Sequence, residues 1–208
     1  MLLARIFTLY PEFFPGPLGK GLYGKALAKK IWKLETINIR DYAIDKHKTV
    51  DDAPFGGGSG MLLKADILSK ALNDHSAGDT TILMPDPKGR RFDWSDAKSL
   101  SLENDLVFLC PSFEGVDHRI LDLFDIRLFS VGDVIVPTGD TPAVLMAESI
   151  IRYLPDVLGC SDCVENDSIL SGLLEAPQYT SPRSIDDAHD VPDILLSGNH
   201  QAIGDWKL

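Results

Sequence analysis

The sequence predicts an α/β protein whose mostly parallel β-sheet carries helices on both faces. Between Lys64 and Thr141, apolar strand-like runs alternate with amphipathic helix-like stretches, which is the βαβαβ pattern of a parallel sheet. Three consecutive strands end in turns rich in proline and glycine, at Pro85–Arg91, Pro111–Asp117 and Val131–Thr141. Because ligands of open parallel sheets bind at the carboxyl ends of the strands, these loops predict a ligand pocket.

The length of 208 residues, of which 44% are hydrophobic, suits one sizeable core or one domain with an appendage. The N-terminal run MLLARIFTLYPEFF contains Arg5 and Pro11, so it indicates a strand and not a signal sequence. No stretch reaches the length that spans a membrane. The cysteines, Cys110, Cys160 and Cys163, are an odd set that favours a cytoplasmic protein.

Charge is unevenly distributed along the chain. The net charge of −11 argues against a protein that coats nucleic acid non-specifically. Residues 1–50 nevertheless hold nine Lys and Arg against four Asp and Glu. This basic part suits a local polyanion site, and a solvated helix face explains it equally well.

The N-terminal part begins with a predicted strand at Arg5–Leu9 and a helix from Leu22 to Lys33. The residues expected to face inward on this helix and after it are Leu22, Ala26, Leu27, Ile31 and Leu34. A second strand is expected at Glu35–Ile39. The polar, glycine-rich segment Arg40–Met61 then follows, and its length is typical of a functional loop or a flexible one. It lacks the Lys-Ser/Thr of a phosphate-binding P-loop.

The regular part has predicted helices at Ala65–Asn73, Ser95–Leu102 and Asp117–Phe124, and strands at Thr80–Met84, Leu106–Cys110 and Ile126–Ser130. An apolar run, Val134–Val136, follows between two glycines. Thr141 is expected as N-cap and Pro142 as first residue of the next helix. Glycine bends before a helix N-terminus suit a polar ligand, although an ordinary strand–turn–helix corner has the same pattern.

After Pro155 the chain indicates an acidic linker and a tail that ends in the start of a helix. Cys160 and Cys163 form a CxxC, but no second pair stands at metal-binding spacing, so a zinc or redox role is disfavoured. No GxGxxG motif is present, so a Rossmann dinucleotide site is not expected.

Several ungapped motifs follow in order along almost the whole chain: TLYPEFF, RDYAIDKHKTVDDAPFGGGSGM, SFEGVDHRI, SVGDVIVPTGDTPA, RYLPDVLG, ENDS, SPRS and VPDILLSGNH. On these motifs the chain resembles the bacterial tRNA (guanine-N1)-methyltransferases. The resemblance implies a SPOUT-class α/β fold whose C-terminal part forms a deep trefoil knot, a rare topology. It also implies a homodimer that binds S-adenosylmethionine in the knot and methylates N1 of guanine 37, 3′ of the tRNA anticodon.

The resemblance divides the chain into a knotted catalytic domain over 1–159, a linker over 160–171 and the start of a helical tRNA-binding domain over 172–208. This last part is shorter than the family's usual C-terminal domain, as if truncated. The segment Lys46–Met61 is expected to help hold the anticodon stem-loop at the dimer interface. Magnesium dependence is implied by the resemblance alone, and no acidic cluster argues for a metal site.

Methylation of guanine N1 removes a proton, so a general base must lie near that nitrogen. By resemblance the base is Asp167, while Arg152 stabilises the negative charge that develops on O6 and Glu114 lies beside the target base. Each has an alternative: Asp167 as a solvated linker acid, Arg152 as a helix C-cap, and Glu114 as a turn residue. The cofactor contacts implied by the resemblance are Met84, Pro85, Asp86, Pro111, Gly115, Val131, Gly132, Asp133, Val134, Ile135, Val136, Gly139 and Pro142.

Four positions depart from the family pattern. Pro111 and Ser112 stand where the family usually has Gly-Arg, Thr138 replaces the first glycine of a Gly-Gly pair, and Asp140 replaces a glutamate. These departures leave a second hypothesis open, namely an S-adenosylmethionine-binding RNA-interaction protein with weak or lost turnover.

Overall fold

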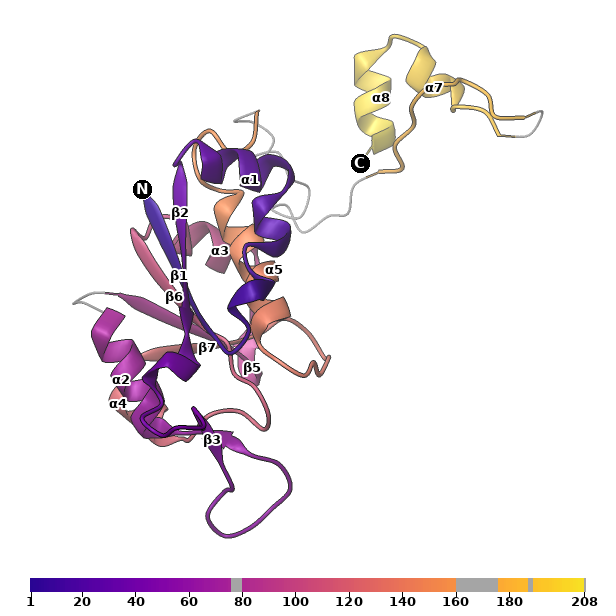
Figure 1. The fold of residues 1–208 in the computed structure, drawn as a ribbon. Helices are drawn as coiled ribbons and strands as arrows, with labels where there is room; N and C mark the ends of the chain where they lie inside the picture. Colours follow the sequence, from indigo (N-terminus) through magenta and orange to yellow (C-terminus); the bar gives the residue numbers. More distant parts are fainter. Residues whose placement is uncertain (76–79, 160–175, 187–188, 208) are drawn as a thin grey trace. The chain divides into compact units, whose positions relative to one another are not determined.

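A five-stranded β-sheet forms the centre of the first part of the chain (Figure 1). Its strands lie in the order β2-β1-β6-β5-β7, namely β2 (Trp32–Asn38), β1 (Leu2–Thr8), β6 (Asp105–Leu109), β5 (Thr81–Arg91) and β7 (Ile126–Ser130). Every neighbouring pair is parallel, so the carboxyl ends of all five strands lie at one edge. The predicted α/β class with a parallel sheet is therefore confirmed.

The computed structural model describes residues 1–75, 80–159, 176–186 and 189–207. The chain consists of two compact units, Met1–Ser161 and Asp162–Leu208. The second unit contains α7 (Asp193–Leu196) and α8 (His200–Lys207), and the ring of Tyr179 packs 6.3 Å from that of Trp206. The helix expected at the end of the tail is thus present.

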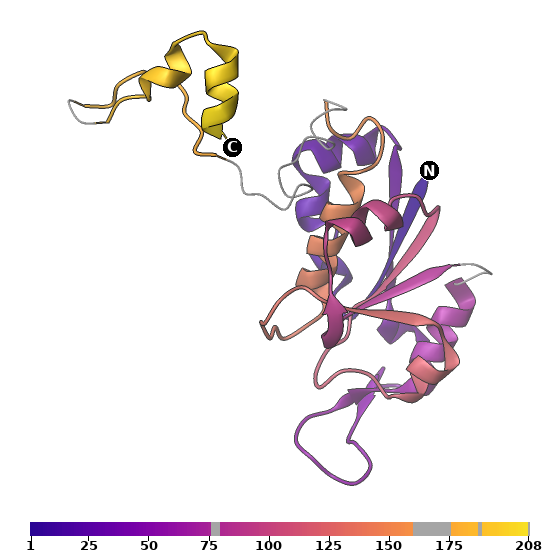
Figure 2. The ribbon, with the colours of Figure 1, turned by 180° about the vertical axis from the view of Figure 1, so that it is seen from behind.

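Helices cover both faces of the sheet, as Figures 1 and 2 show from opposite sides. One face packs against α1 (Gly21–Ala28), α3 (Trp94–Leu100) and α5 (Asp140–Ile151), and the other against α2 (Ala65–His75) and α4 (Arg119–Leu123). In β6, Leu106 and Phe108 enter the first core, whereas Val107 and Leu109 enter the second. A strand buried on both faces is apolar without alternation, which explains the run LVFL.

The segment between β2 and α2 is mostly loop, as expected. It starts with a short 3₁₀ turn, η3 (Ile39–Tyr42), and contains a two-stranded antiparallel hairpin of β3 (Asp51–Asp52) and β4 (Leu62–Leu63). Two more 3₁₀ turns, η1 (Pro11–Phe13) and η2 (Gly16–Gly19), follow β1. The loop between β3 and β4 extends away from the sheet, and Phe55 on it is fully exposed.

The predicted helix Leu22–Lys33 is too long at its C-terminus. α1 ends at Ala28, Lys30 has a left-handed φ of 59°, and Trp32 already belongs to β2. Trp32 is completely buried and its indole N–H donates to the Tyr23 carbonyl, so the need to bury this ring overrides the helical spacing. Leu22, expected to face inward, is instead 47% exposed.

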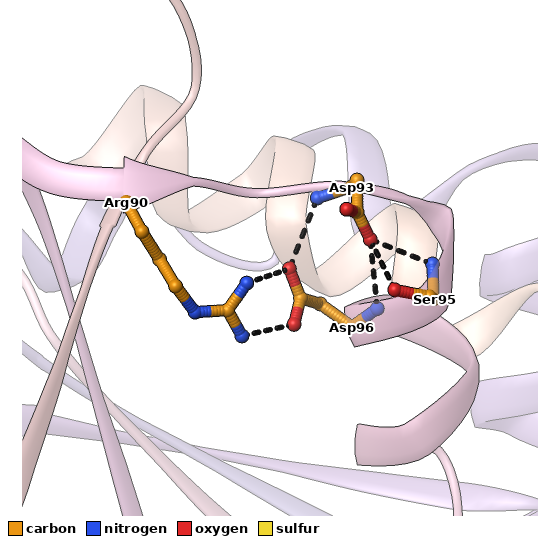
Figure 3. Close-up of polar contacts among 4 residues, drawn as sticks. All are labelled: Arg90, Asp93, Ser95 and Asp96. Carbon is orange, nitrogen blue, oxygen red and sulfur yellow. Dashed lines mark hydrogen bonds and ion pairs between the residues drawn. The ribbon is translucent and has the colours of Figure 1, made fainter.

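The N-terminus of α3 carries a capping box that makes a pH-dependent contribution to stability (Figure 3). The Asp93 carboxylate accepts hydrogen bonds from the Ser95 hydroxyl and from the backbone N–H groups of Ser95 and Asp96, which lower the pKa of Asp93. A carboxyl whose pKa is lowered on folding stabilises above its unfolded pKa and loses that effect as the pH falls.

We expect Asp93→Ala to cost about 1 kcal/mol of unfolding free energy at pH 7. The cost should shrink as the pH falls below about 4, where the unfolded carboxyl and then the folded one become protonated. Urea unfolding at both pH values measures this difference. An equal cost at pH 7 and pH 3 would mean that the charge of Asp93 is not what stabilises the helix.

Candidate functional site

A cavity of about 390 Å³ opens at the carboxyl ends of β5, β6 and β7, where the loop pattern predicts a pocket. All three predicted loops contribute to its lining. Among the residues predicted to bind the cofactor, the lining contains Pro85, Asp86, Pro111, Gly115, Val131, Gly132, Val134, Ile135, Val136, Gly139 and Pro142. The location of the pocket is therefore confirmed. Which ligand these residues bind remains a prediction.

Two of the predicted cofactor contacts do not line the cavity. Met84 is buried in the core beneath α2, because successive residues of β5 point to opposite faces and Met84 faces away from the pocket. Asp133 lies exposed on the loop between two lining residues. The sequence reasoning also missed Phe129 and Lys88, which do line it.

The loops that follow β6 and β7 touch at the base of the cavity. The Gly139 N–H donates to the Pro111 carbonyl at 2.7 Å, and Ser112 and Thr138 form an isolated antiparallel bridge. A Cβ at position 139 would lie 2.4 Å from Cδ of Pro111 and 3.0 Å from Cα of Cys110. Only glycine permits this close approach, which gives the predicted role of Gly139 a physical basis.

A buried polar cluster lies directly below this contact. The Thr8 hydroxyl donates to the Asp140 carboxylate, which is 2% exposed, and the Tyr10 N–H donates to the Thr8 hydroxyl. Burial raises the pKa of the neighbouring Cys110 thiol well above its usual value, and the Asp140 carboxylate raises it further. The thiol of Cys110 is therefore protonated and unreactive at neutral pH.

The same cluster explains why the predicted start of α5 is wrong. The helix begins at Asp140 with Gly139 as N-cap, and not at Pro142 with Thr141 as N-cap. Asp140 is drawn into the first turn by its buried contact with Thr8. Pro142 then occupies the third helical position, where a missing N–H still costs no intrahelical hydrogen bond.

The predicted loop Pro85–Arg91 proves to be part of β5. Pro85 and Arg90 both pair with Phe129 of β7. The intervening residues 86–89 are therefore unpaired and form a bulge in the strand. Gly89 returns the chain close to β7, since a Cβ there would lie 2.5 Å from the Phe129 nitrogen. Asp86, Pro87 and Lys88 of this bulge line the cavity, and we call residues 86–89 the cavity wall.

The apolar run Val134–Val136 does not form a strand. These side chains are 59%, 81% and 40% exposed, and all three line the cavity. Gly132 just before them has a φ of +141°, a conformation that side-chain-bearing residues rarely adopt. The loop thus presents backbone groups and apolar side chains to the cavity instead of packing on the sheet.

Comparison with known proteins fits this architecture. The family described as "tRNA (Guanine-1)-methyltransferase TrmD" matches residues 2–208. The chain belongs to this family. It is 52% identical to a tRNA (guanine-N(1)-)-methyltransferase of Pelagibacter ubique, over all of this chain and 91% of the relative. Proteins of the same name from Bartonella tribocorum and Gluconobacter oxydans are each 46% identical over 98% of this chain and 87% of their own length.

Glu114, the residue expected beside the target base, lines the cavity of this TrmD-family chain. Its N–H donates to the Met61 carbonyl at 3.0 Å, and the Leu63 N–H donates to the Gly115 carbonyl at 2.9 Å. The end of the long segment after β2 therefore lies against the loop that carries Glu114. Glycine suits position 60 here, because its φ of +83° is rarely adopted by other residues and a Cβ there would lie 2.2 Å from Cγ of Glu114.

Arg152 is not among the described residues that line the cavity of its own chain. Arg152 is the C-cap of α5, and the rise of 1.5 Å per residue places it about 15 Å along the helix from Pro142. Asp167, Cys160 and Cys163 lie outside the described residues. The roles of Asp167 and Arg152 therefore remain predictions.

The residues that the structure describes show neither a metal-binding cluster nor a membrane-spanning helix. These contain no group of three or more His, Cys, Asp or Glu side chains able to hold a metal ion. No helix in the same ranges is long and apolar enough to cross a membrane. The trefoil knot implied for the family stays a prediction.

Proposed function

We propose that this protein transfers a methyl group from S-adenosylmethionine to N1 of guanine 37 in tRNA. The observation that carries the proposal is the cavity formed by three loops at the carboxyl edge of the sheet, in a chain that matches the TrmD family over residues 2–208. Its volume of about 390 Å³ is within the range of small-molecule sites.

The residues of the cavity fit S-adenosylmethionine. Proline, glycine and branched aliphatic side chains supply apolar walls for a flat adenine ring, and the loop backbones supply polar groups. The Ser112 hydroxyl, in a residue only 3% exposed, has no hydrogen-bond partner among the described residues. A bound ligand that hydrogen-bonds this hydroxyl would remove the cost of leaving it unpaired. When bound, S-adenosylmethionine supplies the electrophilic methyl group.

The chain's own side chains then act on the guanine. Asp167 takes the proton from N1 and so makes that nitrogen nucleophilic. Arg152 directs its fixed positive charge at O6, where negative charge accumulates as the proton leaves. Glu114, exposed at the cavity, holds the base in place through its carboxylate. The three groups together orient the nitrogen toward the methyl group.

A second copy of the chain completes the site in this proposal. Arg152 lies far along α5 from the cavity of its own chain, so a two-fold dimer that places Arg152 and Asp167 of one copy at the cavity of the other gives two composite sites. The exposed apolar side chains of Val134–Val136 suit burial in such an interface. The exposed lysines of residues 25–33 and the loop over 46–61 offer contacts for tRNA. In this proposal the protein acts in the cytoplasm and requires magnesium.

A methyl-transfer assay on unmodified tRNA tests the function. We expect calorimetry to show that S-adenosylmethionine binds without RNA, and light scattering to show a two-fold dimer. Labelled methyl should be transferred to guanine 37, and not to a tRNA that has another base at this position. Cofactor binding without any transfer would favour the alternative of an RNA-interaction protein that has lost turnover. An active monomer at micromolar concentration would rule out the composite site.

A further inference from the structure

The outer side of the cavity is held by an arginine that no part of the proposed reaction uses. Arg90 directly follows the cavity wall in β5, and its side chain extends toward α3 (Figure 3). There both terminal nitrogens of the guanidinium bind the Asp96 carboxylate. The Nη1–Oδ2 distance is 2.7 Å. Two parallel hydrogen bonds fix the orientation of the guanidinium as well as its position.

The same guanidinium also contacts a residue of the cavity lining. Its Cζ lies 4.5 Å from the ring centroid of Phe129, a residue that lines the cavity and is 2% exposed. Phe129 also pairs with both ends of the cavity wall: with Pro85, just before the wall, and with Arg90, just after it. Arg90 therefore contacts the ring of a lining residue and stands at the C-terminal end of the wall.

The Asp96 side of the contact is rigid. The Asp96 side chain is 9% exposed while that of Arg90 is 61% exposed, so the arginine reaches from the surface to a carboxylate in the protein. Asp96 also accepts the Asp93 N–H at 3.2 Å within the capping box of α3. Without Arg90, a buried carboxylate would keep a single backbone donor, so the native position of the arginine is strongly preferred.

We propose that Arg90 is a positioning residue for the cofactor: by clamping Asp96 and Phe129 it holds the cavity wall in its binding conformation. This inference rests on the proposed function for the identity of the ligand. A wall that is already ordered does not have to be immobilised when the ligand binds, so the clamp acts on affinity and not on the chemical step.

Arg90→Lys is the sharpest variant, because lysine keeps the charge but loses the planar fork and the stacking on Phe129. We expect the dissociation constant for S-adenosylmethionine to rise about tenfold, with kcat at saturating cofactor and the KM for tRNA within twofold of the parent. Calorimetry measures the first quantity and steady-state methylation the other two.

Arg5→Lys is the matched control. Arg5 also makes ion pairs in the same sheet, one with Asp105 and one with Glu35. Asp105 is the first residue of β6 and so lies at the amino edge, away from the cavity. We expect cofactor affinity in this variant to stay within twofold of the parent. Equal weakening in both variants would mean that general loss of sheet stability is responsible, and this result would overturn the clamp.

A second readout needs no cofactor. Lys88 lies exposed within the cavity wall, so release of the wall should speed trypsin cleavage after Lys88 in Arg90→Lys and leave cleavage after Lys33 unchanged. Unchanged affinity together with unchanged cleavage after Lys88 would refute the clamp while the parent still binds S-adenosylmethionine. A parent that fails to bind S-adenosylmethionine would instead overturn the proposed function, and the role of the clamp in cofactor binding with it.

Discussion

Asp167→Asn is expected to slow methyl transfer on the order of 10²–10⁴-fold, the usual contribution of a general base. The amide keeps the shape and hydrogen-bonding reach of the carboxylate but cannot accept the N1 proton. Cofactor affinity should barely change, because the described residues that line the cavity belong to three loops of the first unit. Single-turnover methylation with saturating cofactor and tRNA measures the chemical step alone.

Glu165→Gln provides the control for this experiment, since it neutralises another acid two residues away in the same acidic segment. Its single-turnover rate should remain close to that of the parent. A rate for Asp167→Asn within a few-fold of the parent would remove Asp167 from the mechanism and shift the general-base role to Glu114, which lines the cavity.

Gly139→Ala is expected to damage both the fold and the cofactor site. The added Cβ would lie 2.4 Å from Cδ of Pro111 and 2.9 Å from its nitrogen, and these are atoms of the backbone and a rigid ring. Relief requires the two loops to separate, which costs about 1–3 kcal/mol. Differential scanning calorimetry should show a melting temperature lower by several degrees, and S-adenosylmethionine affinity should fall at least tenfold.

Gly159→Ala is its control, because a Cβ at Gly159 would meet nothing within 4 Å. Its melting temperature and cofactor affinity should match those of the parent. Parent-like values in Gly139→Ala would show that the contact between the loops after β6 and β7 is looser than the structure has it, and that the cavity does not depend on it.

The architecture was predictable because its signals are local. The run LVFL requires a strand buried on both faces, and the proline- and glycine-rich turns after three strands require a common edge. Such features depend on a few neighbouring residues, so they survive without knowledge of tertiary contacts. The pocket could therefore be placed correctly on the sheet before its geometry was known.

The errors arise where a distant residue decides the local structure. Asp140 begins α5 because Thr8 binds its carboxylate, and nothing near Asp140 in the sequence indicates a partner in β1. β5 continues past Pro85 because Phe129 of β7 pairs with it twice, although proline and glycine locally predict a loop. Arg90 was missed for the same reason, since both of its contacts are visible only in three dimensions.

The strand order has a consequence for how the protein is made. β1 leaves the ribosome first and can pair with β2 early, but its other neighbour is β6, so one edge of β1 stays open until residue 109 has been synthesised. An open apolar strand edge attracts other chains, and such long-range pairings form slowly. Nascent chains arrested before β6 should therefore aggregate or recruit chaperones, while chains arrested beyond α5 should resist proteolysis.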